Sequence, residues 1–244
     1  MTRVLVLAGT SEARALIGEI SGRYDVVASL AGVTRDPIDL GCETRVGGFG
    51  GVDGLVDYLR EAAIDVVVDG THPFAAQMTW HAAEACTQAG VAHVILQRRG
   101  WKPAEGDDWR FVERFEEVAG IVPEGVTVFL GTGRQTLDQF AGLTGRRLLC
   151  RVIDPPQRAF PFEGGRFVVG RPPFSVEEEV AFFETEGVDW LVVKNAGGVR
   201  SRSKLDAARQ LGLPVVMQKR PKRPDGPVVW SVAACVDWLE ATCG

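Results

Sequence analysis

Short aliphatic runs alternate with amphipathic stretches along this chain, and glycine stands at most of the joints between them. Residues 3–8 (RVLVLA) lead through a turn at Gly9 into 12–21, where apolar residues recur at helical spacing. Further aliphatic runs in the first half, separated by helical patterns, lie at 25–31, 44–48, 65–70 and 91–97. Apolar strands that alternate with helices are typical of a parallel sheet covered on both faces. The pattern therefore predicts an α/β fold with a doubly wound, Rossmann-like sheet.

The second half of the chain repeats the opening. VTVFLGT at 126–132 matches VLVLAGT 122 positions earlier, and VDWLVVKNAGG at 188–198 matches IDVVVDGTHPF 124 positions earlier. Two matches in the same order at nearly the same offset favour two similar domains. The predicted boundaries are 1–98 for the first domain, 99–124 for a polar junction and 125–244 for the second domain. The last strand, near 228–231, suits either sheet.

The cysteines and the apolar runs indicate a soluble protein of a reducing compartment. The five cysteines include no C-x-x-C pair and no histidine at zinc-ligand spacing, so the sequence predicts neither a disulfide framework nor a metal site. The opening apolar run is too short for a signal peptide, and no run reaches the roughly 20 apolar residues that span a bilayer. We therefore expect a cytoplasmic location and no membrane partner.

Positive charge is concentrated in one segment of an acidic chain. The net charge is −5, yet residues 194–223 carry nine basic side chains and one acidic side chain, Asp206. A solvated basic surface explains such a segment, and so does a small polyanionic ligand. Nucleic acid is disfavoured as a partner, because the acidic remainder of the chain would repel it.

Open parallel sheets bind ligands at the carboxyl ends of their strands, which makes four joints candidate sites. They are 9–11, 70–74, 131–134 and 194–198. At the first joint, Gly9, Thr10 and Ser11 offer a turn and two hydroxyls to a phosphate, and a plain helix N-cap is the alternative. Arg35 follows the second strand, where such folds place a cation for the 2′-phosphate of NADP; a surface loop residue is the alternative there.

The other joints add a histidine and several cations. His72 is the only histidine at a joint, and both proton transfer and plain loop packing suit it. From the second half, 131–134 and Lys194 offer amides, a guanidinium and an ammonium. The stretch 197–204 combines glycines with three cations, which suits a mobile lid over carboxylates or an ordinary exposed loop.

Several catalytic motifs are absent from the sequence. It contains no G-x-S-x-G elbow, no Walker G-x-x-x-x-G-K-[ST] and no H-E-x-x-H. Hydrolases and P-loop NTPases are therefore disfavoured. The residues by themselves indicate a two-domain α/β protein with a nucleotide-like half and an anion-collecting half.

Four segments stand out in their order along the chain. They are VLVLAGTSEARAL (4–16), DGTHPFAAQMT (69–79), LGTGRQTL (130–137) and VVKNAGG with KLDAARQLGLPVVMQKRP (192–221). Together they make the chain similar to the precorrin-6A reductase family of cobalamin biosynthesis. Three residues depart from the family pattern: Ala8 and Ala196 stand where relatives often carry Gly and Ser, and Gly70 stands where Ala is usual. None of these changes removes an ionisable group.

The resemblance implies an oxidoreductase that passes a hydride from NADPH to the precorrin-6A macrocycle, with a proton added to give precorrin-6B. It also implies two Rossmann-like domains with the active site in the cleft between them. The expected coenzyme-binding residues are Gly9, Thr10, Ser11, Arg35 and Thr71, and the expected proton donor is His72. The expected partners of the carboxylate-rich tetrapyrrole are Thr132, Gly133, Arg134, Arg151, Lys194, Arg200, Arg202 and Lys204.

Three questions stay open at this level. A cobalt-precorrin-6A reductase of the anaerobic pathway has the same expected fold and chemistry, and a non-catalytic dinucleotide sensor is an alternative of another class. Because the halves are alike, residues 131–134 could hold the coenzyme phosphates instead of the substrate. A transient contact with the next enzyme of the pathway is also left open.

Overall fold

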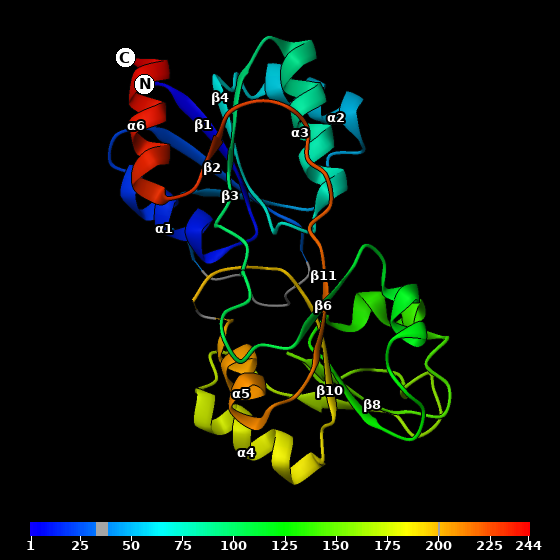
Figure 1. Cartoon of the computed structure of the whole chain (residues 1–244). Helices are drawn as coiled ribbons and strands as arrows, with labels where there is room; N and C mark the ends of the chain where they lie inside the picture. Colours follow the sequence, from blue (N-terminus) through cyan, green and yellow to red (C-terminus); the bar gives the residue numbers. More distant parts are fainter. Residues whose placement is uncertain (33–38, 200) are drawn as a thin grey trace. The chain divides into compact units, whose positions relative to one another are not determined.

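A computed structural model describes residues 1–32, 39–199 and 201–244 of the chain. The described residues form two compact units, each built on a parallel sheet of six strands (Figure 1). Unit 1 contains Met1–Arg99 and Pro221–Gly244, and unit 2 contains Gly100–Arg220. The prediction of two parallel-sheet α/β domains is confirmed.

Unit 1 follows the predicted order of strands and helices. Its strands are β1 (Arg3–Ala8), β2 (Asp25–Leu30), β3 (Glu43–Val46), β4 (Val66–Gly70), β5 (Ala92–Leu96) and β12 (Val228–Val229). Its helices are α1 (Ser11–Ile20), α2 (Val52–Glu61), α3 (Ala76–Ala89) and α6 (Val232–Cys243). Val4 and Val6 of β1 pack against α1 and α6, whereas Leu5 and Leu7 pack against α2 and α3. Both faces of the strand are buried, which explains its unbroken aliphatic sequence.

Unit 2 has the same plan with different helices. Its strands are β6 (Trp109–Val112), β7 (Thr127–Leu130), β8 (Arg147–Val152), β9 (Arg166–Val169), β10 (Trp190–Lys194) and β11 (Val215–Gln218). Its helices are α4 (Val176–Glu186), α5 (Ser203–Leu211) and two 3₁₀ helices, η1 (Phe115–Gly120) and η2 (Arg134–Phe140). Phe129 and Leu191 pack against α4 and α5, and Val128 and Leu130 pack against η1 and η2. A 3₁₀ helix thus replaces α1 at the point where the two halves match in sequence.

The two sheets have the same strand arrangement, but their edge strands are exchanged. The orders are β12-β5-β4-β1-β2-β3 in unit 1 and β6-β11-β10-β7-β8-β9 in unit 2, with every pairing between the described strands parallel. β6 follows the first five strands along the chain, yet it pairs with β11 in the second sheet. β12 follows β11 and pairs with β5 in the first sheet. Each unit therefore takes its sixth strand from the half of the chain that built the other.

This exchange changes the domain boundaries. Residues 99–124 are not only a junction, because they contain β6 and η1, and the range 125–244 loses its last 24 residues to unit 1. Three prolines between 221 and 227 keep that segment extended. The Trp80 indole donates a hydrogen bond to the Lys222 carbonyl (3.3 Å), and the guanidinium of Arg223 lies 5.0 Å from the Trp230 ring centre. These contacts within unit 1 hold the segment that leads into β12.

Helix α6 completes the core of unit 1, where it packs beside α1 (Figure 1). Leu239 and Cys235 are fully buried in the cluster that contains Val4 and Ile17. We predict that Leu239→Ala destabilises unit 1 by about 2–5 kcal/mol, because it leaves a cavity in this core. Hydrogen exchange should show reduced protection in β1, β4 and α1 and unchanged protection in β7, β10 and α5. Equal loss in both units would contradict the assignment of α6 to unit 1.

Candidate functional site

Two joints at the carboxyl edge of the first sheet lie against each other. The Thr10 hydroxyl donates a hydrogen bond to the Gly70 carbonyl (2.8 Å) and accepts one from the Ala13 N–H (3.2 Å). A β carbon at Gly9 would lie 3.2 Å from the backbone nitrogen of His72. A β carbon at Gly70 would lie only 2.7 Å from that of Ala13. Small residues therefore allow the joint after β1 and the joint after β4 to meet.

A negatively charged side chain of the protein itself, Glu12, lies at the N-terminus of α1. The Glu12 carboxylate accepts hydrogen bonds from its own N–H, from the Ser11 hydroxyl (3.1 Å) and from the Arg98 guanidinium (2.8 Å). Burial by itself raises the pKa of Glu12, but these donors outweigh it and hold the pKa below its ordinary value. The helix terminus and Arg98 together thus stabilise a negative charge.

The joint after β4 is ordered by its own side chains. The carboxylate of Asp69, which is 1% exposed, accepts a hydrogen bond from the Thr71 N–H (3.0 Å). The Phe74 N–H donates to Nδ1 of His72 (3.3 Å). A ring nitrogen that accepts a hydrogen bond carries no proton, so neutral His72 carries its proton on Nε2. The Thr71 hydroxyl lies 3.4 Å from the Thr79 hydroxyl.

The corresponding edge of the second sheet presents hydroxyl and cationic groups. Thr132 is buried, and its hydroxyl oxygen has no hydrogen-bond partner among the residues that the structure describes. Arg134 is exposed, and Gly133 before it has a φ of 77°. Lys194 ends β10, which pairs in parallel with β7, so its side chain belongs to the same edge. Burial lowers the pKa of Lys194 below its ordinary value.

A pocket of about 150 Å³ lies at the carboxyl ends of β7 and β8. The Arg151 guanidinium and the Glu179 carboxylate form an ion pair in its wall (2.6 Å), and Glu179 is 1% exposed. The Lys204 ammonium donates a hydrogen bond to the Ser201 carbonyl (2.6 Å). Burial of this ammonium lowers the pKa of Lys204 to about 8, while Glu179 opposes the shift and Arg151 adds to it. Three ionisable side chains therefore line the same small pocket.

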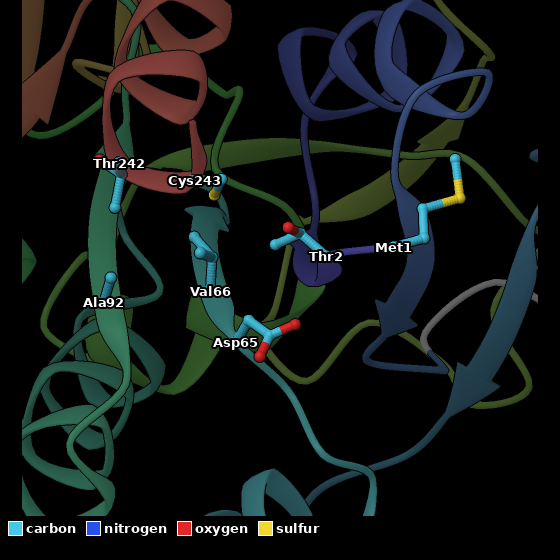
Figure 2. Close-up of a pocket in the computed structure, with 7 residues that line it drawn as sticks. All are labelled: Met1, Thr2, Asp65, Val66, Ala92, Thr242 and Cys243. Atoms are coloured by element: carbon cyan, nitrogen blue, oxygen red, sulfur yellow. The ribbon is translucent and has the colours of Figure 1, made fainter.

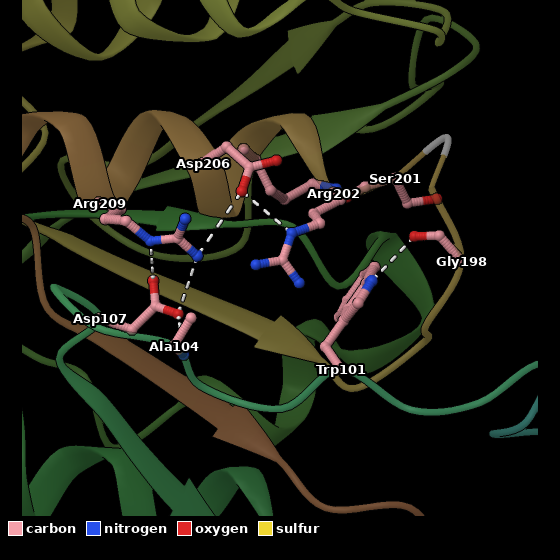
Figure 3. Close-up of polar contacts among 9 residues, drawn as sticks. Trp101, Ala104, Asp107, Gly198, Ser201, Arg202, Asp206 and Arg209 are labelled. Atoms are coloured by element: carbon pink, nitrogen blue, oxygen red, sulfur yellow. Dashed lines mark hydrogen bonds and ion pairs between the residues drawn. The ribbon is translucent and has the colours of Figure 1, made fainter.

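Side-chain contacts hold the chain before α5 at Gly198 and at Arg202 (Figure 3). The Trp101 indole N–H donates to the Gly198 carbonyl (2.8 Å), and the Arg202 guanidinium donates to the Asp206 carboxylate (3.0 Å). Arg209 also lies 3.8 Å from that carboxylate. The contact with Asp206 therefore orients the Arg202 guanidinium along α5.

The predicted site residues fall into two groups, one in each unit. The group in unit 1 contains Gly9, Thr10, Ser11, Thr71 and His72 at the carboxyl edge of the first sheet. The group in unit 2 contains Thr132, Gly133, Arg134, Arg151, Lys194, Arg202 and Lys204 at or beside the carboxyl edge of the second sheet. Arg35 and Arg200 lie outside the described residues.

The prediction from sequence missed three residues that shape these groups. Glu179 sits in the run Glu177–Glu179, which resembles a solvated helix face, although its spacing from Phe183 puts it on the buried side. Arg98 is the last residue of the predicted first domain and Trp101 lies in the predicted junction, and nothing in the sequence indicates the partner of either. Of these three residues, only Glu179 could have been found from the sequence, because its helical spacing from Phe183 indicates burial.

A second pocket, of about 420 Å³, lies at the opposite edge of the first sheet (Figure 2). Asp65, Val66 and Ala92 mark the amino ends of β4 and β5, and Thr242 and Cys243 come from α6. Ligands of open parallel sheets bind at the carboxyl ends, so the size of this pocket does not make it the candidate site.

Neither a metal site nor a membrane-spanning helix is found among the described residues. In the ranges that the structure covers, no group of three or more His, Cys, Asp or Glu side chains is arranged to hold a metal ion. Nor does any helix there have both the length and the apolar character needed to cross a bilayer.

The fold and these two edges define the class of two-domain α/β proteins with Rossmann-like parallel sheets. The family model described as "Precorrin-6x reductase CbiJ/CobK" matches residues 3–240. The precorrin-6A reductase of Rhodococcus erythropolis is 43% identical, over 98% of this chain and 98% of its own. A solved structure titled "CobK precorrin-6A reductase" superposes with a TM-score of 0.94 at 39% identity, covering 99% of this chain and 97% of its own. The cobalt-precorrin-6A reductase of Priestia megaterium is 30% identical, over 92% of this chain and 93% of its own.

The chain therefore belongs to the precorrin-6x reductase CbiJ/CobK family, a family of oxidoreductases. The resemblance found in the four sequence segments is confirmed.

The buried ammonium of Lys204 has a consequence for stability. Its pKa falls from an ordinary 10.5 to about 8 on folding, so the charged form is disfavoured in the folded state. At ~1.4 kcal/mol per pKa unit, we predict that Lys204→Met raises the free energy of unfolding at pH 7 by up to ~3 kcal/mol. This gain should shrink as the pH rises from 8 to 10.5, because folding then releases the proton of the wild-type lysine. Denaturant unfolding at pH 7 and pH 9.5 measures both effects, and a less stable variant at pH 7 would show that the lysine is structural.

Proposed function

We propose that this protein transfers a hydride from NADPH to the precorrin-6A macrocycle and adds a proton, giving precorrin-6B in cobalamin biosynthesis. The observation that carries the proposal is the match to proteins named precorrin-6A reductase along nearly the whole chain, in sequence and in fold. The reductase reaction follows from the family; the coenzyme and the role of each residue are the proposal.

The coenzyme is assigned to unit 1. Gly9 supports the assignment, because the chain there passes so close to the Thr71–His72 backbone that a β carbon would lie only 3.2 Å from the His72 nitrogen. The N-terminus of α1 supports it as well, since that position and Arg98 already stabilise the Glu12 carboxylate. A phosphate of the bound coenzyme would displace the Glu12 carboxylate from the N-terminus of α1 and from Arg98. Gly9, Thr10, Ser11, Thr71 and, outside the described residues, Arg35 would line the coenzyme.

When bound, NADPH supplies the hydride, so the side chains contribute binding, orientation and a proton. Thr10 positions the turn, because its hydroxyl is engaged with the Gly70 carbonyl and the Ala13 N–H. His72 holds a proton on Nε2 in its neutral form, and it is the proposed donor to the ring carbon next to the reduced position.

The tetrapyrrole is assigned to the cationic edge of unit 2. Arg134 and Lys194 follow adjacent parallel strands, and Arg202 and Lys204 stand at the start of α5. Cations in such an arrangement fix the orientation of a ligand that bears several carboxylates. Thr132, Gly133, Arg151 and, outside the described residues, Arg200 complete the proposed set.

Metal-free precorrin-6A is the favoured substrate over its cobalt form. The relative named precorrin-6A reductase is 43% identical, against 30% for the relative named cobalt-precorrin-6A reductase. The cytoplasm is the proposed location, since all five cysteines are free thiols.

An absorbance time course with NADPH and precorrin-6A tests this function. We expect the coenzyme and macrocycle bands to decay in equal molar amounts. Turnover of the cobalt form alone would identify the anaerobic reaction. Binding of both ligands without turnover would indicate a sensor.

His72→Ala tests the proton donor. We expect kcat to fall about 10²–10⁴-fold, as for the loss of a general acid, while the Kd of NADPH changes little. The pH–rate profile should also lose the limb that reports this group. Near-normal turnover with an unchanged pH dependence would remove His72 from the mechanism.

A further inference from the structure

The pocket of unit 2 is too small for a whole tetrapyrrole. Its volume of about 150 Å³ is below the roughly 300 Å³ at which pockets begin to enclose complete ligands. Phe129 and Gly131 come from the end of β7, Val152 from the end of β8, and Phe174 from the segment before α4. The space therefore suits one arm of a larger molecule.

The charges in the pocket do not cancel. Among the described residues, its ionisable lining residues are Arg151, Glu179 and Lys204. Arg151 is committed to Glu179 by a 2.6 Å contact, and its guanidinium also lies 4.2 Å from the Phe174 ring centre. The Lys204 ammonium bonds a neutral acceptor, the Ser201 carbonyl. Among the described lining residues, one positive charge, that of Lys204, is left without a counter-charge.

Glu179 limits which anions can enter. Its Oε1 contacts Arg151, and its Oε2 is buried with no hydrogen-bond partner among the described residues. A dianion would meet this negative oxygen and exceed the single available positive charge, whereas a monoanion would balance that charge.

The apolar walls of the pocket determine which chemical group can carry the bound carboxylate. Five apolar residues line the pocket: Phe129, Val152, Ile153, Pro172 and Phe174. Such walls bury a short aliphatic stem favourably. Gly131 leaves room for the stem of Lys204, since a β carbon there would lie 3.4 Å from Cδ of the lysine.

We propose that this pocket is a subsite for a single short aliphatic monocarboxylate, an acetate or propionate arm of the substrate, held by the Lys204 ammonium. Arg151 and Glu179 form its wall as a neutral pair, and Glu179 excludes dianions. The assignment of this arm to the tetrapyrrole substrate rests on the function proposed above. The preference for a short monocarboxylate rests on the pocket alone.

The first test uses sodium propionate as the probe on the full-length protein, followed by NMR shifts of the Ser203 and Lys204 amides. We expect saturable binding to the wild type and about tenfold or greater weakening in Lys204→Met. Propionamide, the neutral analogue, and sulfate, a dianion at neutral pH, should not bind there. Lys102→Met is the matched control, because it removes an exposed lysine of the same unit outside the pocket. Equal binding by Lys204→Met, or by propionamide, would overturn the proposal.

A second variant tests the role of Glu179. Glu179→Gln keeps an oxygen for Arg151 but removes the negative charge, so we expect the dianion sulfate to bind at the pocket in this variant only. Exclusion of sulfate by the variant as strictly as by the wild type would show that Glu179 does not set the selectivity.

Kinetics connect the pocket to the reaction. In Lys204→Met the KM for precorrin-6A should rise about tenfold or more, with kcat within about threefold of wild type and the Kd of NADPH unchanged. Propionate should compete with precorrin-6A and not with NADPH. An unchanged KM would overturn the subsite while leaving the reductase function intact. Propionate binding in a protein that never reduces precorrin-6A would instead contradict the function and separate the pocket from it.

Discussion

Parallel pairing is the constraint on which both units depend. Because every described strand pair is parallel, each strand must return across a face of its sheet before the next begins. All carboxyl ends then lie along one edge, and residues far apart in the sequence meet there. Thr10 and Gly70 are 60 positions apart and share a hydrogen bond for this reason. In unit 2 the same geometry places Arg151, at the end of β8, beside the end of β7.

The carboxyl edges of the two sheets bring their candidate site residues together in different ways. In unit 1, missing side chains at Gly9 and Gly70 let two joints and a helix pack in contact. In unit 2, charge is balanced within a small space: Arg151 and Glu179 neutralise each other, and Lys204 remains. Close approach of backbone suits a phosphate-bearing coenzyme, and an excess of buried positive charge suits a carboxylate.

Much of the fold was predictable because the inner strands are mostly apolar. β1, β4, β7 and β10 are buried on both faces, and their sequences show it. β6 was missed because it is short and lies at the edge of its sheet, where Arg110 and Phe111 are exposed. The exchange of β6 and β12 was also beyond prediction, since both sheets offer the same kind of edge. In the candidate site, local residue types were enough to propose His72 and Lys204, but the Arg151–Glu179 and Arg98–Glu12 pairs join distant segments, so no local pattern indicates them.

The exchanged edge strands impose an order on synthesis at the ribosome. All of unit 2, from β6 to β11, is translated before β12 and α6 emerge. During that interval the nascent unit 1 has an uncovered strand, β5, and an apolar groove beside α1 that Cys235 and Leu239 will later fill. The first domain to be started is therefore the last to be completed, and the nascent chain must protect that groove from other apolar surfaces until its final helix arrives.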